Sequence, residues 1–146
     1  MNKINEKAPV QCAKSILIHT GKELVWKVLT NIDQWPSWQS DIKKAKLHGE
    51  LKRGTTFDWK SGGAGIYSTL KTVDPYQSIG WTGNSMGLFA IHHWTLTEKG
   101  DAVEVKVEES MEGFLAGLLK NWFNKNLEKG MMLWLALVKS ECEKHV

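Results

Sequence analysis

The sequence predicts an α+β fold in which a seven-stranded, curved antiparallel sheet wraps around one long C-terminal helix. Six segments of period-two alternation, separated by short turns rich in Gly, Asp and Asn, fill residues 42–112. The last stretch, Gly113–Val146, repeats apolar residues at helical spacing. An antiparallel sheet has an apolar face that must be covered, and this helix is the one predicted element long enough to cover it.

The elements before residue 42 are a strand and two short helices. The strand is predicted at Gln11–His19, after polar residues 1–10 that we expect to be frayed. Thr20 and Glu23 have the spacing of a capping box, which predicts that a helix begins there. Pro36 should end this helix, and residues 37–40 should form a second short turn. Of the two indoles that bracket Pro36, Trp35 is expected to be a hydrophobic plug. Trp38 could be a plug or a gate to a cavity.

The meander is predicted from alternation and turn chemistry. Its strands are placed at Ile42–His48, Thr55–Lys60, Ile66–Asp74, Ser78–Gly83, Leu88–Thr97 and Ala102–Met111. Consecutive strands joined by short turns pair with their neighbours. The last strand is the clearest, because Val103, Val105 and Val107 alternate with charged residues. We therefore expect its valines to face the core.

The C-terminal helix has an apolar stripe with an unusual centre. The inward stripe is predicted to consist of Leu115, Leu119, Phe123, Leu127, Gly130, Trp134, Leu137 and Val138. The opposite side is predicted to carry Lys120, Asn121, Asn124, Glu128 and Lys139. Asn126 and Gly130 interrupt the apolar face, and an interior Gly costs about 1 kcal/mol relative to Ala. This pattern indicates either a close helix crossing or a helix that is hollowed to line a cavity.

Composition narrows the classes of function. With 146 residues and three scattered prolines, the chain fits one domain, residues 1–146. Its charge of +3 comes from 19 basic and 16 acidic residues that are interleaved, which argues against nucleic-acid binding. Eight Trp residues can fill a core or line a pocket for a flat apolar ligand.

Location is predicted from the cysteines and the apolar runs. Two cysteines do not make a disulfide framework, so a reducing compartment is expected. The longest apolar run is far shorter than the roughly 20 residues that cross a bilayer. We therefore expect a cytoplasmic protein without a membrane span.

Two constellations could carry chemistry. Ser85 lies in a G-x-S-x-G pattern, but the strand that follows it is incompatible with the strand, turn and helix of a nucleophile elbow. His92 and Glu109 are predicted to face the interior from neighbouring strands, where they could act as an acid–base pair. No third ligand of suitable spacing is visible, so neither a metal nor another cofactor is expected.

Four local motifs resemble those of a known family. They are Trp35-Pro36-Ser37-Trp38, Ile79-Gly80-Trp81-Thr82-Gly83, His92-x-Trp94-x-Leu96 and Val107-Glu108-Glu109-Ser110-x-x-Gly113. With the order of elements, they resemble the polyketide cyclase/dehydrase family of the START-like (SRPBCC, birch-pollen-allergen-like) superfamily, from about Cys12 to Cys142. The resemblance implies a helix-grip fold with a deep cavity for hydrophobic molecules such as lipids, sterols or aromatic polyketides. It assigns no catalytic residue to this chain.

Three functions follow as hypotheses. The first is binding of a hydrophobic small molecule by a monomer or weak homodimer. Its predicted ligand-binding residues are Trp38, Phe57, Trp59, Ile66, Ser68, Trp81, His92, Trp94, Glu109, Leu119, Trp122, Phe123, Asn126 and Gly130. The second is a cyclase or dehydratase that uses His92 and Glu109. The third is a co-chaperone-like protein-interaction domain, with an outer surface formed by Lys43, Lys44, Lys46, Met131, Met132 and Leu135.

Overall fold

An antiparallel sheet forms the body of the protein, for which the computed structural model describes residues 4–144. The strands are β1 (Val10–Ile18), β2 (Ile42–Leu47), β3 (Thr56–Ser61), β4 (Ala64–Asp74), β5 (Ser78–Ser85), β6 (Leu88–Lys99) and β7 (Ala102–Glu112). Their order across the sheet is β1-β7-β6-β5-β4-β3-β2, with every neighbouring pair antiparallel. The predicted seven-stranded meander is therefore confirmed.

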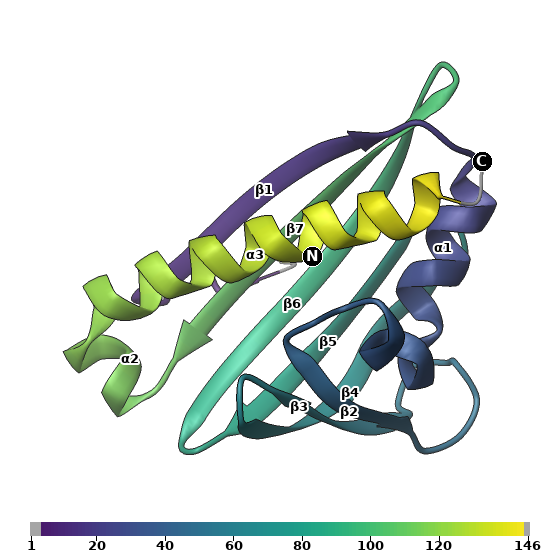
Figure 1. Cartoon of the computed structure of the whole chain (residues 1–146). Coiled ribbons are helices and arrows are strands. Elements are labelled where there is room, and N and C mark those ends of the chain that lie inside the picture. Colours follow the sequence, from purple (N-terminus) through teal and green to yellow (C-terminus); the bar gives the residue numbers. More distant parts are fainter. Residues whose placement is uncertain (1–3, 145–146) are drawn as a thin grey trace.

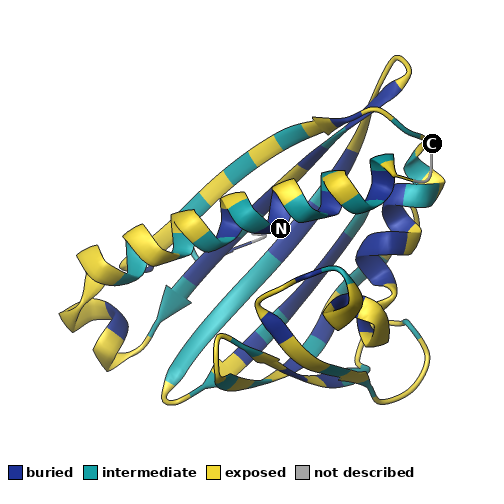
Figure 2. Ribbon diagram, viewed as in Figure 1, coloured by how far each residue is buried: buried dark blue, intermediate teal, exposed yellow. Residues whose placement is uncertain are grey.

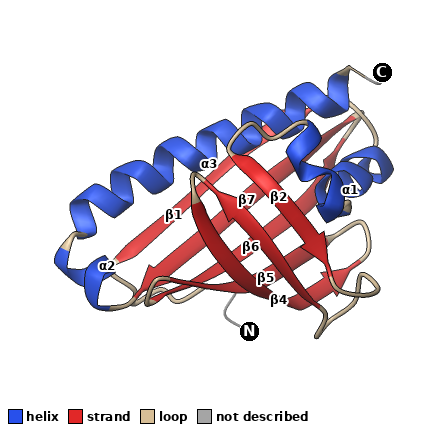
Figure 3. Cartoon of the chain, turned by 60° about the horizontal axis from the view of Figure 1, so that its bottom comes forward, coloured by secondary structure: helices blue, strands red, loops and turns tan. Residues whose placement is uncertain are grey.

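Helices lie over one face and at both ends of this sheet. They are α1 (Lys22–Thr30), the 3-10 helix η1 (Ile32–Ser37), α2 (Phe114–Leu118) and α3 (Lys120–Glu143). Figure 1 shows α3 lying along β1 and β7, with α2 at one end of the sheet and α1 at the other. In Figure 3 the strands curve beneath α3, as a helix-grip fold requires.

Two details of the α1 region differ from the prediction. Gly21 is the N-cap of α1, and no side chain caps it, so the predicted capping box at Thr20 is wrong. The Thr20 amide instead donates to the Ile18 carbonyl in a tight turn after β1. Pro36 lies inside η1 and does not precede a second helix. The Trp35 indole donates to the Leu29 carbonyl at 3.0 Å and so holds this turn against the end of α1.

The first residues of the described chain are packed, which corrects the expected fraying of residues 1–10. Ile4 and Ala8 are buried. The Asn5 amide donates to Ser110 Oγ at 3.0 Å, and its side chain donates to the Glu112 carboxylate. These bonds attach the segment to the end of β7. Residues 1–3 of that prediction lie outside the described residues.

The C-terminal segment is two helices, so the prediction of one continuous helix is wrong. Gly113 precedes α2 with φ of 129°, and Leu119 separates α2 from α3 with non-helical angles of −115° and 37°. Helix α2 buries Ala116 at the end of the sheet, whereas α3 follows β1. One straight helix could not do both.

The face that α3 turns inward is rotated from the predicted stripe. Its buried residues are Met131, Trp134, Leu135, Val138 and Cys142. Met131 and Leu135 were predicted to lie outside, but each is only 3% exposed, and of that group on α3 only Met132 is exposed. The rotation arises because α3 lies over the β1 edge of the sheet.

Polar side chains of α3 bind the edge of β1, although they were predicted to face outward. Asn124 accepts a hydrogen bond from the Gln11 amide and donates one to the Pro9 carbonyl, both at 3.0 Å. Glu128 pairs with Lys14 at 3.0 Å. An edge strand has unpaired backbone groups, and Asn124 satisfies two such groups, at Pro9 and Gln11, whereas Glu128 binds the Lys14 side chain.

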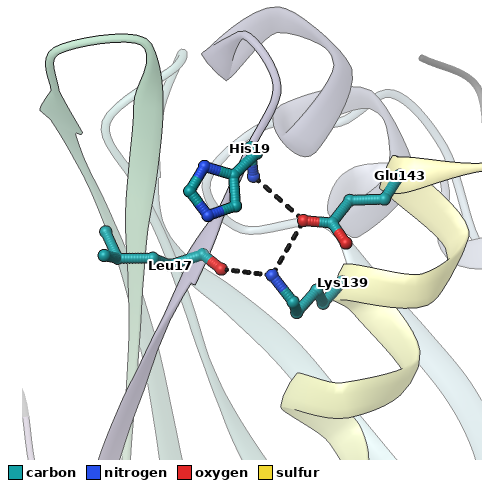
Figure 4. A network of polar contacts seen from close by, with 4 residues as sticks. All are labelled: Leu17, His19, Lys139 and Glu143. Carbon is teal, nitrogen blue, oxygen red and sulfur yellow. Dashed lines mark hydrogen bonds and ion pairs between the residues drawn. The ribbon is translucent and has the colours of Figure 1, made fainter.

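A second group of contacts holds the end of α3 to the end of β1 (Figure 4). Lys139 Nζ donates to the Leu17 carbonyl and to Glu143, both at 2.8 Å. The Glu143 carboxylate also accepts from the His19 amide at 3.1 Å. The pKa of the Glu143 carboxyl lies below its ordinary value of 4.5, chiefly because Lys139 donates to it and secondly because the His19 amide does.

The contacts of Glu143 with Lys139 and His19 make the stability of the fold depend on pH. A carboxyl whose pKa is lowered by folding stabilises the fold above its unfolded pKa, and the contribution is lost as the pH falls through the folded value. We expect Glu143→Gln to lower the melting temperature at about pH 7 and to have little effect at about pH 3, measured by circular dichroism. Glu50→Gln is the control, because Lys52 lies 4.0 Å from that exposed carboxylate. An equal loss at both pH values for Glu143→Gln would contradict the assignment.

Candidate functional site

A cluster of aromatic rings fills part of the space between the sheet and α3. Trp35 is fully buried, and its ring centroid lies 5.2–5.7 Å from those of four others. The four are Phe57, Trp59, Trp81 and Trp134. Three of these contacts are edge-to-face, which is a preferred geometry for such rings. The ring of Trp35 is therefore the plug that the sequence predicts.

A cavity lies beside this aromatic cluster. It has a volume of about 210 Å³ and lies between the sheet and α3. Its walls are formed by Trp59, Ser61, Ile66, His92, Trp94, Val107, Glu109, Met111, Asn126, Leu127, Gly130, Met131 and Trp134. In Figure 2 the strands beneath α3 are largely buried or half-buried, whereas α2 and the start of α3 are largely exposed. The apolar and aromatic walls are suited to a flat, largely apolar molecule.

A polar pair lies in the cavity wall. His92 on β6 and Glu109 on β7 are directly paired in the strand register, and His92 Nε2 lies 2.7 Å from Glu109 Oε1. Their side chains are only 12% and 7% exposed. The imidazole also stacks on Trp81, with centroids 5.2 Å apart and planes inclined by 17°. Packing and pairing thus hold both side chains in one orientation.

Several buried ring nitrogens near this pair have no hydrogen-bond partner within residues 4–144. They are His92 Nδ1, Trp81 Nε1 and Trp94 Nε1. By contrast, the Trp59 indole donates to Ser68 Oγ at 2.9 Å, so the Ser68 hydroxyl already has a partner. An indole nitrogen can only donate, and leaving it unpaired in a core costs about 1–3 kcal/mol. His92 and Trp94 also line the cavity, but these two nitrogen atoms are themselves buried.

The structure brings half of the predicted ligand-binding residues to the cavity wall. Those that line it are Trp59, Ile66, His92, Trp94, Glu109, Asn126 and Gly130. Phe57, Ser68 and Trp81 are buried beside it, and Trp38 contacts the ring of Trp134.

Leu119, Trp122 and Phe123 do not line the cavity. Leu119 and Trp122 are exposed, and Phe123 is half-buried with its ring against that of Trp122. Leu119 precedes α3, and Trp122 and Phe123 lie in its first turn, whereas the first residue of α3 that lines the cavity is Asn126.

Six residues of the wall were absent from the predicted site. They are Ser61, Val107, Met111, Leu127, Met131 and Trp134. Val107, Met111, Leu127 and Trp134 lay on the predicted inward faces, so the pattern contained the signal for them. Ser61 and Met131 had no such signal. Ser61 is the last residue of β3, and Met131 faces inward only because α3 is rotated from the predicted stripe.

The described residues contain neither a metal-binding cluster nor a membrane-spanning helix. Among residues 4–144, no group of three or more His, Cys, Asp and Glu side chains is placed to hold a metal ion. Within the same range, no helix has the length and apolarity to span a bilayer.

A seven-stranded antiparallel sheet that grips a C-terminal helix over an apolar cavity defines the START-like, helix-grip class of proteins. Residues 9–132 match the model of the family described as polyketide cyclase / dehydrase and lipid transport, and the chain belongs to this family. The resemblance seen in the local motifs is thereby confirmed. A search of curated proteins found no match.

Solved structures share this fold at low sequence identity. A hypothetical protein, jhp0584, from Helicobacter pylori has a TM-score of 0.85 at 16% identity, covering 97% of each chain. A START superfamily protein from Mycobacterium smegmatis has a TM-score of 0.80 at 11% identity, covering 93% of this chain and 99% of that one. The Zhui aromatase/cyclase from Streptomyces sp. R1128 has a TM-score of 0.78 at 14% identity, covering 92% and 93%. These similarities show the fold.

Proposed function

We propose that the protein binds a small, flat, largely apolar molecule that carries an oxygen atom, in the cavity between the sheet and α3. The observation that carries this proposal is an apolar cavity whose wall contains the His92–Glu109 pair. The apolar walls favour a hydrophobic body. The polar pair favours an oxygen atom on the ligand, such as a phenol or carbonyl oxygen.

The size of the cavity limits the ligand. Pockets that bind drug-sized molecules have volumes of about 300–1,000 Å³, and a cavity of about 150 Å³ is enough for benzene. The cavity here, at about 210 Å³, suits one or two fused rings. A whole sterol or an extended polyketide would require the aromatic cluster around Trp35 to open.

The proposal is tested with naphthalene and 2-naphthol, followed by tryptophan fluorescence. Both should bind, and 2-naphthol should bind about 5–10-fold more tightly, because a hydrogen bond contributes about 1–1.5 kcal/mol. Equal affinities would contradict a role for the polar wall. No binding of either compound would contradict the proposal as a whole.

Gly130 offers a variant that blocks the cavity. This residue lines the cavity, and a Cβ atom there would have no heavy atom within 4 Å, so a side chain has room to enter. We expect Gly130→Leu to weaken 2-naphthol binding at least about 10-fold while raising stability, because an interior helical Gly costs about 1 kcal/mol. Thermal unfolding and the fluorescence titration measure the two effects.

Gly117→Ala is the matched control for the blocked cavity. Gly117 is also helical, and a Cβ atom there would likewise have no heavy atom within 4 Å, but it lies in α2, away from the cavity. It should leave the affinity for 2-naphthol unchanged. If Gly130→Leu were to bind 2-naphthol as tightly as the unmodified protein, the ligand would lie elsewhere.

A second candidate function is proton-transfer catalysis on such a ligand. The observation that favours it is the hydrogen bond of 2.7 Å between His92 and Glu109 in the cavity wall. A carboxylate that orients an imidazole is a common acid–base arrangement. The two candidates differ in one result: Glu109→Gln should abolish turnover of a substrate, whereas in a binding protein it should only weaken the affinity.

A further inference from the structure

Large apolar side chains gather at the α2 end of the molecule. We call them the terminal patch, and they are Met86, Phe114, Leu115, Leu118, Leu119 and Trp122. Phe114 and Met86 are 81% and 79% exposed, and Trp122 is 59% exposed. Gly113 brings the β5–β6 turn against α2, since a Cβ there would lie 2.6 Å from the Gly87 carbonyl oxygen. Exposed apolar residues that gather in this way mark an interaction site.

The terminal patch continues from the cavity. Asn126, Gly130 and Trp134 line the cavity on successive turns of α3. Trp122 stands one turn before Asn126, and Asn126 Nδ2 donates to the Trp122 carbonyl at 2.8 Å. Trp122 therefore continues the row of cavity residues along α3, and the other apolar side chains of the terminal patch lie around it. Asn126 is exposed as well as part of the cavity wall, so the cavity reaches the surface there, and what covers Trp122 would also cover this opening.

The surroundings of the terminal patch are basic. Lys120, Lys125 and Lys129 are exposed, and none of them pairs with a carboxylate within residues 4–144. Two acidic residues lie nearby: Glu128 is paired with Lys14, and Glu112, just before α2, accepts a hydrogen bond from the Asn5 side chain. A surface of Trp, Phe and Leu beside unpaired lysines fits a membrane interface that contains anionic lipids.

We propose that the terminal patch docks on the surface of an anionic lipid bilayer, with Phe114, Leu118 and Trp122 entering the headgroup boundary. The lysines would then lie at the level of the headgroups, and the cavity would open toward the lipid. A second copy of the chain fits this face less well, because a two-fold contact would bring the same lysines together. This proposal does not depend on which ligand the cavity binds.

The test is sedimentation of the full chain with vesicles of phosphatidylcholine and phosphatidylserine in equal amounts, compared with vesicles of phosphatidylcholine alone. The protein should bind the anionic vesicles more tightly. The double variant Phe114→Ser and Leu118→Ser should bind them at least about 10-fold more weakly, because two large apolar groups no longer enter the interface. Each change of Lys120, Lys125 or Lys129 to Glu should weaken binding about fivefold or more.

Met132→Ser is the matched control. Met132 is also an exposed apolar residue of α3, at 57%, but it is not part of the terminal patch. It should bind anionic vesicles as the unmodified protein does, and circular dichroism should show that all variants are folded. The proposal is overturned if the protein binds neither kind of vesicle, or if the double variant binds as well as Met132→Ser. A dimer in solution that the double variant abolishes, without vesicle binding, would assign the terminal patch to a second copy instead.

Discussion

Replacing Trp35 with alanine is expected to lower the free energy of unfolding by about 3–5 kcal/mol. Trp35 is fully buried, and its ring contacts four others from the sheet and α3. Its indole also donates to the Leu29 carbonyl, which joins α1 to the core. The substitution therefore removes the centre of the aromatic cluster and leaves a buried carbonyl without its partner. Urea denaturation, followed by circular dichroism, measures the loss.

Trp122→Ala is the control for this prediction, since the chemical change is the same at an exposed indole. Its cost should be below about 1 kcal/mol, as for most surface substitutions. A loss below about 1 kcal/mol for Trp35→Ala would mean that the ring cluster does not hold the sheet and α3 together.

Glu109→Ala is expected to lower the free energy of unfolding by about 2–4 kcal/mol. The carboxylate is buried, and its Oε1 lies 2.7 Å from His92 Nε2. Because His92 Nδ1 already has no partner within the described chain, the substitution leaves both ring nitrogens unpaired. The measurement is again urea denaturation, at a fixed pH.

The double variant His92→Phe and Glu109→Leu separates stability from function. An apolar pair of similar volume can replace a buried polar pair at little cost, and Phe can keep the stacking on Trp81. We expect its stability to return to within about 1 kcal/mol of the unmodified protein. Its preference for 2-naphthol over naphthalene should fall. A double variant less stable than Glu109→Ala would show that the polar pair itself stabilises the fold.

A double variant as stable as the unmodified protein would show that the fold does not require a polar pair at this place in the core. In that case hydrophobic residues would hold β6 and β7 together equally well, and the presence of His92 and Glu109 would indicate a role beyond packing. Orienting a ligand and transferring a proton are the two roles that the cavity allows. The naphthol comparison tests the first role, and a turnover assay with Glu109→Gln tests the second.

The sequence alone determined the sheet and much of the cavity wall. Strand boundaries follow from period-two alternation and from turn residues, which are local signals, and the register of a meander follows from them. Because of that register, the alternation of two neighbouring strands is enough to place His92 beside Glu109. Gly130 and Asn126 likewise marked the place where α3 leaves space.

The tertiary structure decided where the C-terminal helix breaks and which of its faces turns inward, because local patterns do not contain this information. The break at Leu119 and the rotation of α3 arise because the helix follows the edge of β1, where Asn124 and Glu143 bind unpaired backbone groups. Those contacts join residues more than 100 positions apart, so no helical period could predict them. The same rotation buries Met131 and leaves Trp122 exposed. The sequence shows which residues are apolar, but the packing of α3 on β1 decides which of them face the cavity and which face outward.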